Sequence, residues 1–153
     1  MDGPDLEFGL DDLSIVNSIA LLVPFDGRFE FDTTTNIARF GRKVVDSSKI
    51  DDARLIVEPT FRSRNISLVF GVLGEIRLLL PLRKGERNVV RDDVRDGVVA
   101  MLERSQIVIP NNDPYDPKGK FARSGSPTNV TREEAIALVR HPPLPGERLP
   151  IVI

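Results

Sequence analysis

The stretch that decides the fold is residues 65–82, which read NISLVFGVLGEIRLLLPL. Its apolar side chains fall on every second position: Ile66, Leu68 and Phe70 before the turn at residues 71–74, and Ile76, Leu78, Leu80 and Leu82 after it. Such alternation predicts an antiparallel hairpin with one apolar face. Because each buried leucine or isoleucine contributes roughly 1.5–3 kcal/mol, that face has to be covered.

A helix that can cover the hairpin is predicted at about residues 89–105. Its apolar side chains recur at helical spacing: Val90, Val94, Val98, Met101 and Leu102. Asp92 and Asp93 stand near its start, where negative charge complements the positive end of the helix dipole. Gly97 costs a helix interior about 1 kcal/mol relative to alanine, so it indicates close packing against the sheet.

The chain before the hairpin offers weaker signals. Residues 54–59 predict a short strand, and residues 13–32 predict a hairpin whose turn contains Asp26-Gly27. Residues 36–45 fit a helical stripe, but Gly41 and the β-branched pair Val44-Val45 argue against a helix, so both interpretations stay open.

The chain after the covering helix becomes looser. Residues 107–109 predict a short strand, and residues 110–130 predict a long loop, which is typically functional or disordered. A short helix is predicted at about residues 131–140, where Thr131 and Glu134 have the spacing of a capping box.

These elements predict an α+β fold: a mainly antiparallel β-sheet covered by one amphipathic helix, with a short second helix and extended terminal arms. The expected organisation is an exposed N-terminal arm at residues 1–12, a β-rich core domain with its covering helix at residues 13–109, and a loop, helix and proline-rich arm at residues 110–153. The arm at residues 1–12, which mixes acids with apolar side chains, has a second interpretation as a partner-binding peptide.

Composition restricts the classes of function. The chain has 153 residues, no cysteine and a net charge of −2, so disulfides, thiolate chemistry and cysteine-based zinc sites are excluded. This charge gives no support for nucleic acid or a membrane surface as a partner, although a local basic face is compatible with it. The acidic start and the short apolar runs predict no signal peptide and no transmembrane segment. We therefore expect a soluble protein, cytoplasmic or within a particle.

No catalytic, cofactor or metal site is predicted. The single histidine, His141, has no acid or base partner near it in sequence, so the pattern predicts no nucleophilic triad. Asn111, Asp113 and Asp116 suggest calcium ligands, but the positions that require glycine and glutamate in a calcium-binding loop hold Asp116 and Ala122. Turn chemistry explains this loop better. An enzyme would need residues 110–130 to cover a pocket that the sequence does not reveal.

Basic residues gather around the hairpin and the start of the covering helix. The ones that we predict to bind an acidic partner or a phosphate are Arg77, Arg83, Lys84 and Arg87. The alternative is an ordinary solvated surface, because Glu75, Glu86 and Asp92 are interleaved with them. The chain also has few aromatic residues that could stack on bases.

The chain ends on an apolar, β-branched segment that follows a stiff run of prolines. A terminus is normally polar and frayed unless something holds it, so this segment either closes the protein's own sheet or docks on a neighbour. The residues predicted to form an assembly interface are Leu144, Leu149, Ile151 and Ile153.

Two families share short features with the chain. Gly71-Val72-Leu73 and the ending Ile151-Val152-Ile153 resemble a strand signature and a docking tail of small heat-shock proteins, although those lack the helices predicted here. A small sheet domain with Val57-Glu58-Pro59, a hairpin and a covering helix is similar, over about residues 50–105, to small matrix proteins of negative-strand RNA viruses. Both resemblances imply self-assembly.

The leading hypothesis is thus a non-enzymatic structural or assembly subunit of a larger complex, such as a viral particle, which associates with itself or with other subunits through its terminal arms. The alternative is a small adaptor or binding module that uses the local basic patch for an acidic partner or nucleic acid.

Overall fold

The structure is a computed structural model, and it describes residues 21–24, 28–72, 74–108, 115 and 128–151. The predicted N-terminal arm at residues 1–12 and the calcium-like residues Asn111, Asp113 and Asp116 lie outside these ranges. The described residues form two mainly antiparallel sheets and two α-helices, so the predicted α+β class is confirmed.

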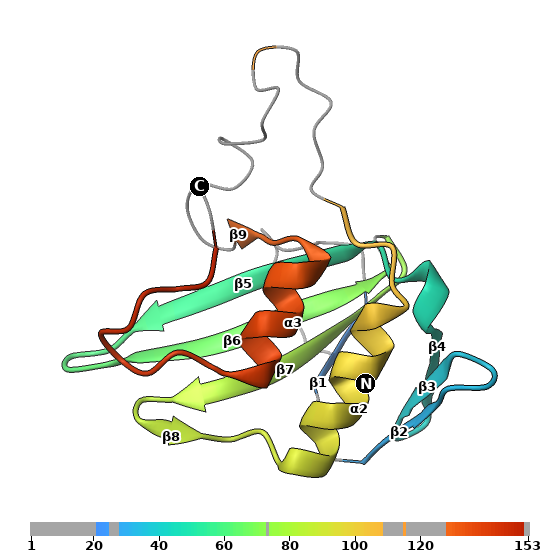
Figure 1. The fold of residues 1–153 in the computed structure, drawn as a ribbon, viewed down its shortest axis with the longest axis horizontal. Helices are drawn as coiled ribbons and strands as arrows, with labels where there is room; N and C mark the ends of the chain where they lie inside the picture. The colour runs from blue at the N-terminus through green and yellow to red at the C-terminus, as the bar shows by residue number, and fades with distance from the viewer. Residues whose placement is uncertain (1–20, 25–27, 73, 109–114, 116–127, 152–153) are drawn as a thin grey trace, which may run out of the picture.

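The larger sheet has the strand order β1-β7-β6-β5-β9, and β8 also pairs with β7 (Figure 1). Its strands are β1 (Leu21–Pro24), β5 (Asp52–Pro59), β6 (Arg64–Val72), β7 (Ile76–Lys84), β8 (Arg87–Asn88) and β9 (Thr128–Asn129). All pairs are antiparallel except β1 with β7. Strands β6 and β7 form the antiparallel pair that the alternation predicted, and they lie at the centre of this sheet.

The smaller sheet has the order β2-β3-β4, all antiparallel, and stands at one end of the larger one (Figure 1). Its strands are β2 (Phe29–Asp32), β3 (Ile37–Phe40) and β4 (Lys43–Asp46), and the short 3₁₀ turn η1 (Ser47–Lys49) leads from β4 toward β5.

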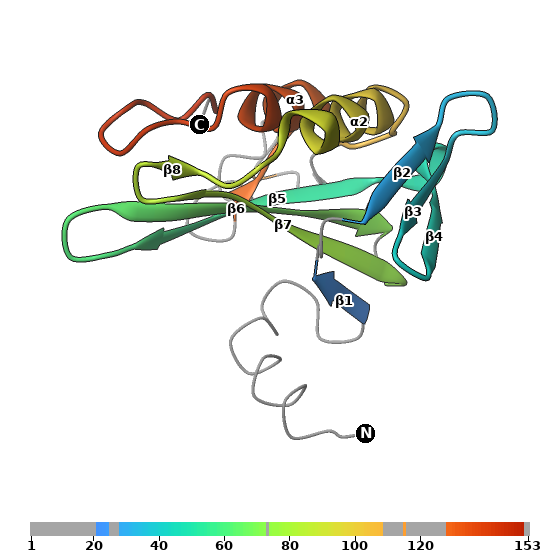
Figure 2. The ribbon, with the colours of Figure 1, turned by 90° about the horizontal axis from the view of Figure 1, so that it is seen from below.

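Helices α2 (Asp92–Glu103) and α3 (Arg132–Arg140) lie side by side on one face of the larger sheet (Figure 2). The facing strands present cross-strand rows of apolar side chains, such as Leu55, Leu68 and Leu80, all of which are buried. From the helices, the buried side chains are Val94, Val98, Val99, Met101, Leu102, Ala135, Leu138 and Val139. The core thus lies between the helices and the larger sheet and extends to Ala38, Phe40 and Val45 of the smaller sheet. Two helices rather than one cover the larger sheet.

Helix α3 begins where the sequence predicted, and α2 begins at Asp92, three residues after its predicted start. Asp92 and Asp93 occupy the first turn of α2. At α3 the Glu134 amide donates to Thr131 Oγ1 at 3.1 Å, and the Thr131 amide donates to Glu134 Oε1 at 2.8 Å, which confirms the capping box. Since these bonds satisfy amides that a helix start leaves unpaired, they help to fix where α3 begins.

The predicted hairpin at residues 13–32 is wrong. β1 joins the edge of β7 in a parallel pair, from Leu21 opposite Ile76 to Pro24 opposite Leu79, whereas β2 pairs with β3 in the other sheet. The physical reason is that each strand pairs with the edge whose backbone groups would otherwise stay unpaired, and a local turn signal cannot reveal that edge. Residues 13–20 and 25–27 lie outside the described ranges.

Residues 36–45 form two strands, which decides between the two interpretations of this stretch. Gly41 stands at the turn between β3 and β4 with φ 62°, a conformation that glycine adopts without strain. The strand predicted at residues 107–109 is not formed at Ile107 and Val108, although Ile107 is buried. Burial of an apolar side chain does not require strand pairing, which explains this error.

Candidate functional site

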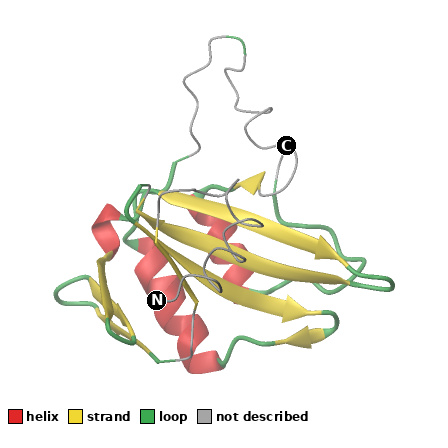
Figure 3. Ribbon diagram, turned by 180° about the vertical axis from the view of Figure 1, so that it is seen from behind, coloured by secondary structure: helices red, strands yellow, loops and turns green. Residues whose placement is uncertain are grey.

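Three loops that are distant in sequence meet at the end of the molecule opposite the smaller sheet (Figures 1 and 3). They are the β5–β6 turn, the β7–β8 turn, and the segment that follows α3. We call residues 58–64, 83–87 and 142–148 the loop end. Two hydrogen bonds from one amide tie the first two loops together: the Gly85 amide donates to the Arg64 carbonyl oxygen at 3.2 Å and to the side-chain oxygen Oδ1 of Asn65 at 3.1 Å.

Arg83 holds the third loop in place from inside. Its side chain is buried, and Nε and Nη2 donate to the carbonyl oxygen of Pro142 at 3.1 and 2.8 Å. Nη1 donates to the carbonyl oxygen of Glu86 at 2.7 Å. One guanidinium therefore joins the β7–β8 turn to the chain after α3, because its fork of donors reaches both carbonyls at once.

Arg64 also holds the segment that follows α3, through hydrogen bonds to its backbone. Its Nη2 donates to the carbonyl oxygens of Leu144 and Glu147 at 3.0 and 2.6 Å. Between those carbonyls the chain makes a tight turn, in which the Glu147 amide donates to the Leu144 carbonyl oxygen at 2.9 Å. Pro145 and Gly146, the latter at φ 88°, suit the two central positions of such a turn. The loop end is consequently a cross-braced surface.

The surface of the loop end carries an unusually exposed aromatic side chain. Phe61, in the β5–β6 turn, is 93% exposed, and the guanidinium carbon of Arg62 lies 5.4 Å from the centre of its ring. Leu144 is also exposed, at 42%. Aromatic residues and arginine are the side chains that most often dominate the energy of protein interfaces. An exposed phenylalanine beside an arginine is therefore a candidate anchor for a partner.

Several cations at the loop end have no acidic partner among the described residues. Lys84, Arg87 and Arg148 are exposed, and no described carboxylate forms an ion pair with any of them. Across the loop end, six basic residues (Arg62, Arg64, Arg83, Lys84, Arg87, Arg148) stand against three acidic ones (Glu58, Glu86, Glu147), a local charge of +3 in a chain whose net charge is −2. The surface thus favours an acidic ligand.

Three of the four predicted basic site residues come together here. Lys84 and Arg87 lie on the surface, whereas Arg83 is buried beneath it as a brace. Sequence reasoning missed Phe61 and Arg148 as surface residues of this site. A phenylalanine in a turn, between Pro59 and Ser63, was a signal that could have revealed Phe61, because turns lie at the surface.

Arg77, the fourth predicted residue, lies on the face of the larger sheet that the helices do not cover. It is only 1% exposed, and its Nη1 lies 2.7 Å from Oδ2 of the equally buried Asp52. Gly71, on the strand between them, is the register partner of both residues. The ion pair therefore spans β6 at a position without a side chain, and Arg77 is not part of the loop end.

Burial changes the pKa of Arg77, and close packing beside the ion pair restricts the residue type at position 71. Desolvation lowers the pKa of Arg77, and the Asp52 carboxylate opposes that shift. At Gly71, a Cβ atom would collide with the carbonyl oxygen of Ile76, so the close approach of β6 and β7 requires glycine there.

The predicted assembly residues have mixed positions. Leu149 and Ile151 pack against the protein's own core, Leu144 is exposed at the loop end, and Ile153 lies outside the described residues. In this structure the segment after α3 thus turns back on its own chain through Arg83 and Arg64. Assembly through these residues stays a prediction.

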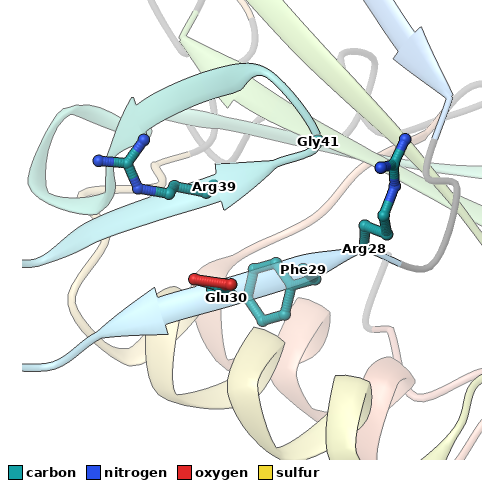
Figure 4. Close-up of a pocket in the computed structure, with 5 residues that line it drawn as sticks. All are labelled: Arg28, Phe29, Glu30, Arg39 and Gly41. Carbon is teal, nitrogen blue, oxygen red and sulfur yellow. The ribbon is translucent and has the colours of Figure 1, made fainter.

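Hollows also lie elsewhere on the described surface. A groove of about 380 Å³ crosses β2 and β3, where Glu30 and Arg39 stand on neighbouring strands and Arg28 lies beside Gly41 (Figure 4). Another, of about 460 Å³, lies between α2 and α3 and includes His141, which is 3.9 Å from Glu147. Both are open and chemically mixed. The described residues contain no cluster of three or more His, Asp or Glu that could hold a metal ion, and no described helix is long and apolar enough to cross a membrane.

Comparison with protein-family models, with curated proteins and with solved structures found no match. The resemblances to small heat-shock and viral matrix proteins therefore gain no support from these comparisons.

Proposed function

We propose that the protein is a non-enzymatic binding module, and that its loop end docks on an acidic surface of a partner. The observation that carries the proposal is Phe61, 93% exposed on a braced turn among cations that no described carboxylate neutralises. A rigid surface binds with a smaller loss of conformational entropy than a loose one, so the braces at Arg64 and Arg83 favour this role.

A protein partner suits this surface better than nucleic acid. The loop end offers one exposed aromatic ring, whereas single-strand binding surfaces stack successive bases on several. Self-assembly through the C-terminal segment is less favoured, because Leu149 and Ile151 would have to leave the core against which they pack.

The test is the binding of a labelled peptide of alternating glutamate and leucine, measured by fluorescence anisotropy at low and high salt. We expect the double variant Lys84→Gln/Arg87→Gln to weaken binding by about tenfold, or about 1.4 kcal/mol. Binding should also fall steeply as salt rises, because the contacts are exposed.

The matched control removes the same charge at the opposite end of the molecule. Arg39 and Arg42 are exposed near the smaller sheet, and Arg39→Gln/Arg42→Gln should leave the affinity within twofold or so. Equal losses of peptide affinity in the two double variants, or an affinity that does not change with salt, would refute the proposal. Tighter binding of a single-stranded oligonucleotide than of the peptide would assign the surface to nucleic acid instead.

A further inference from the structure

The charges of this chain are segregated along the sequence. Residues 1–20 contain five acids (Asp2, Asp5, Glu7, Asp11, Asp12) and no lysine, arginine or histidine. Subtracting them from the totals of 21 basic and 23 acidic residues leaves 21 basic and 18 acidic residues in the rest of the chain, a charge of +3. The same polypeptide thus contains an acidic segment that complements the loop end in charge.

The first twelve residues have the chemistry that complements the loop end. Acids alternate there with apolar side chains in the run Asp5-Leu6-Glu7-Phe8-Gly9-Leu10-Asp11-Asp12. The loop end presents Lys84, Arg87 and Arg148 for the acids, and Phe61 and Leu144 for the apolar side chains. We propose that the loop end binds residues 1–12 of this chain. The inference rests on the proposed function and names its occupant.

The reach of the chain allows this contact. β1 begins at Leu21, opposite Ile76 at one end of β7, and Lys84 lies eight residues further along that strand. Eight strand residues span about 27 Å, and the eight residues 13–20 bridge about the same distance when extended. The segment therefore reaches the loop end of its own copy or of a neighbouring copy, and in the second case the contact makes the protein self-associate.

Because the natural chain contains no cysteine, a disulfide can form only between cysteines that are introduced for the test. The test pair is Gly9→Cys with Thr60→Cys, where Thr60 is exposed next to Phe61 and neither change alters a charge. The control pair is Gly9→Cys with Thr35→Cys. Thr35 is exposed in the turn between β2 and β3, at the end of the molecule opposite the loop end. Both full-length variants are oxidised mildly, and the products are separated on a non-reducing gel.

We expect the test pair to cross-link roughly ten times faster than the control pair at low salt, because docking raises the effective concentration of one thiol near the other. The advantage should disappear at high salt, and also when Asp5, Glu7, Asp11 and Asp12 are changed to their amides. A cross-linked monomer places the segment on its own copy, and a dimer places it on a neighbour; both uphold the inference.

Equal rates for the two pairs would overturn it. If the glutamate–leucine peptide still binds the loop end in that case, only the identity of the occupant fails; if it does not bind, the proposed function fails as well. Should a cysteine variant not fold, as judged by circular dichroism, a synthetic peptide of residues 1–12 replaces it. That peptide must displace the labelled peptide from the unmodified protein, and failure to do so counts against the inference.

Discussion

The guanidinium of Arg83 donates two hydrogen bonds to the carbonyl oxygen of Pro142, a residue 59 positions further along the chain. Both partners are buried, so water cannot replace the lost bonds easily. This contact turns a residue that the sequence presents as a surface cation into a structural brace, and it keeps the segment after α3 on its own copy.

Removing that brace should destabilise the fold. We expect Arg83→Met to lower the free energy of unfolding by about 2–3 kcal/mol, because the carbonyl oxygens of Pro142 and Glu86 lose their donors. Urea unfolding measures this loss. Lys84→Met is the control, because replacing the exposed Lys84 should change the free energy of unfolding by no more than about 0.5 kcal/mol. Similar losses in both variants would contradict the bracing role.

Truncation distinguishes a cis role of the C-terminal segment from a role in assembly. Deleting residues 142–153 removes the Pro142 acceptor of Arg83, the Leu144 and Glu147 acceptors of Arg64, and the contacts of Leu149 and Ile151 with the core. We expect the free energy of unfolding to fall at least as far as in Arg83→Met, while the mass in light scattering changes only by the deleted residues. A large species that dissociates on truncation, with stability unchanged, would support assembly through the segment.

The buried ion pair of Asp52 and Arg77 should show strong coupling. Asp52→Asn leaves the Arg77 guanidinium buried without a counter-charge, so we expect a loss of about 3–5 kcal/mol. In the double variant Asp52→Asn/Arg77→Met that charge is gone, and much of the stability should return. A double-mutant cycle in urea measures the coupling, and additive losses would show that the two side chains act independently.

Replacement of Gly97 by alanine should destabilise the protein. In a helix interior alanine is more favourable than glycine by about 1 kcal/mol. A Cβ atom at position 97, however, would lie 2.5 Å from Cε2 of Phe29. Because overpacking typically costs about 1–3 kcal/mol, we expect Gly97→Ala to lower the thermal midpoint. Phe29→Leu in the same chain should recover part of the loss, whereas a stabilised single variant would show that Phe29 moves aside freely.

Asp46 gives a prediction about pH. The side-chain hydrogen bond from Ser48 lowers the pKa of the Asp46 carboxyl, and the Ser48 amide adds to this effect. A carboxyl whose pKa is lower in the folded than in the unfolded state stabilises the fold above its unfolded pKa, near 3.9, and loses that contribution as the pH falls through its folded pKa.

We therefore expect Asp46→Asn to be less stable than the natural chain at pH 7 and to match it once the pH is below the folded pKa of Asp46. Thermal unfolding across this pH range measures the difference. Glu75→Gln, at an exposed carboxylate, serves as the comparison for a general effect of charge. A difference between Asp46→Asn and the natural chain that stays constant with pH would rule out the ionised Asp46 carboxylate as its cause.

The sequence by itself determined the elements whose signals are local. Alternation in residues 65–82 placed the central hairpin, a stripe at helical spacing placed α2, and the pairing of Thr131 with Glu134 placed the start of α3. Such patterns are readable because one face of each element must be apolar, and because a helix start must find partners for its own amides.

Only the tertiary structure decided which strand edges join and which charges stay at the surface. Local turn signals did not reveal that β1 pairs with β7, since the partner lies more than fifty residues away. Among similar-looking basic residues, Arg77 and Arg83 are buried because Asp52 and the Pro142 carbonyl lie within reach, while Lys84 and Arg87 remain exposed. A cation's role depends on the acceptors that folding brings to it, and residue type and spacing do not contain that information.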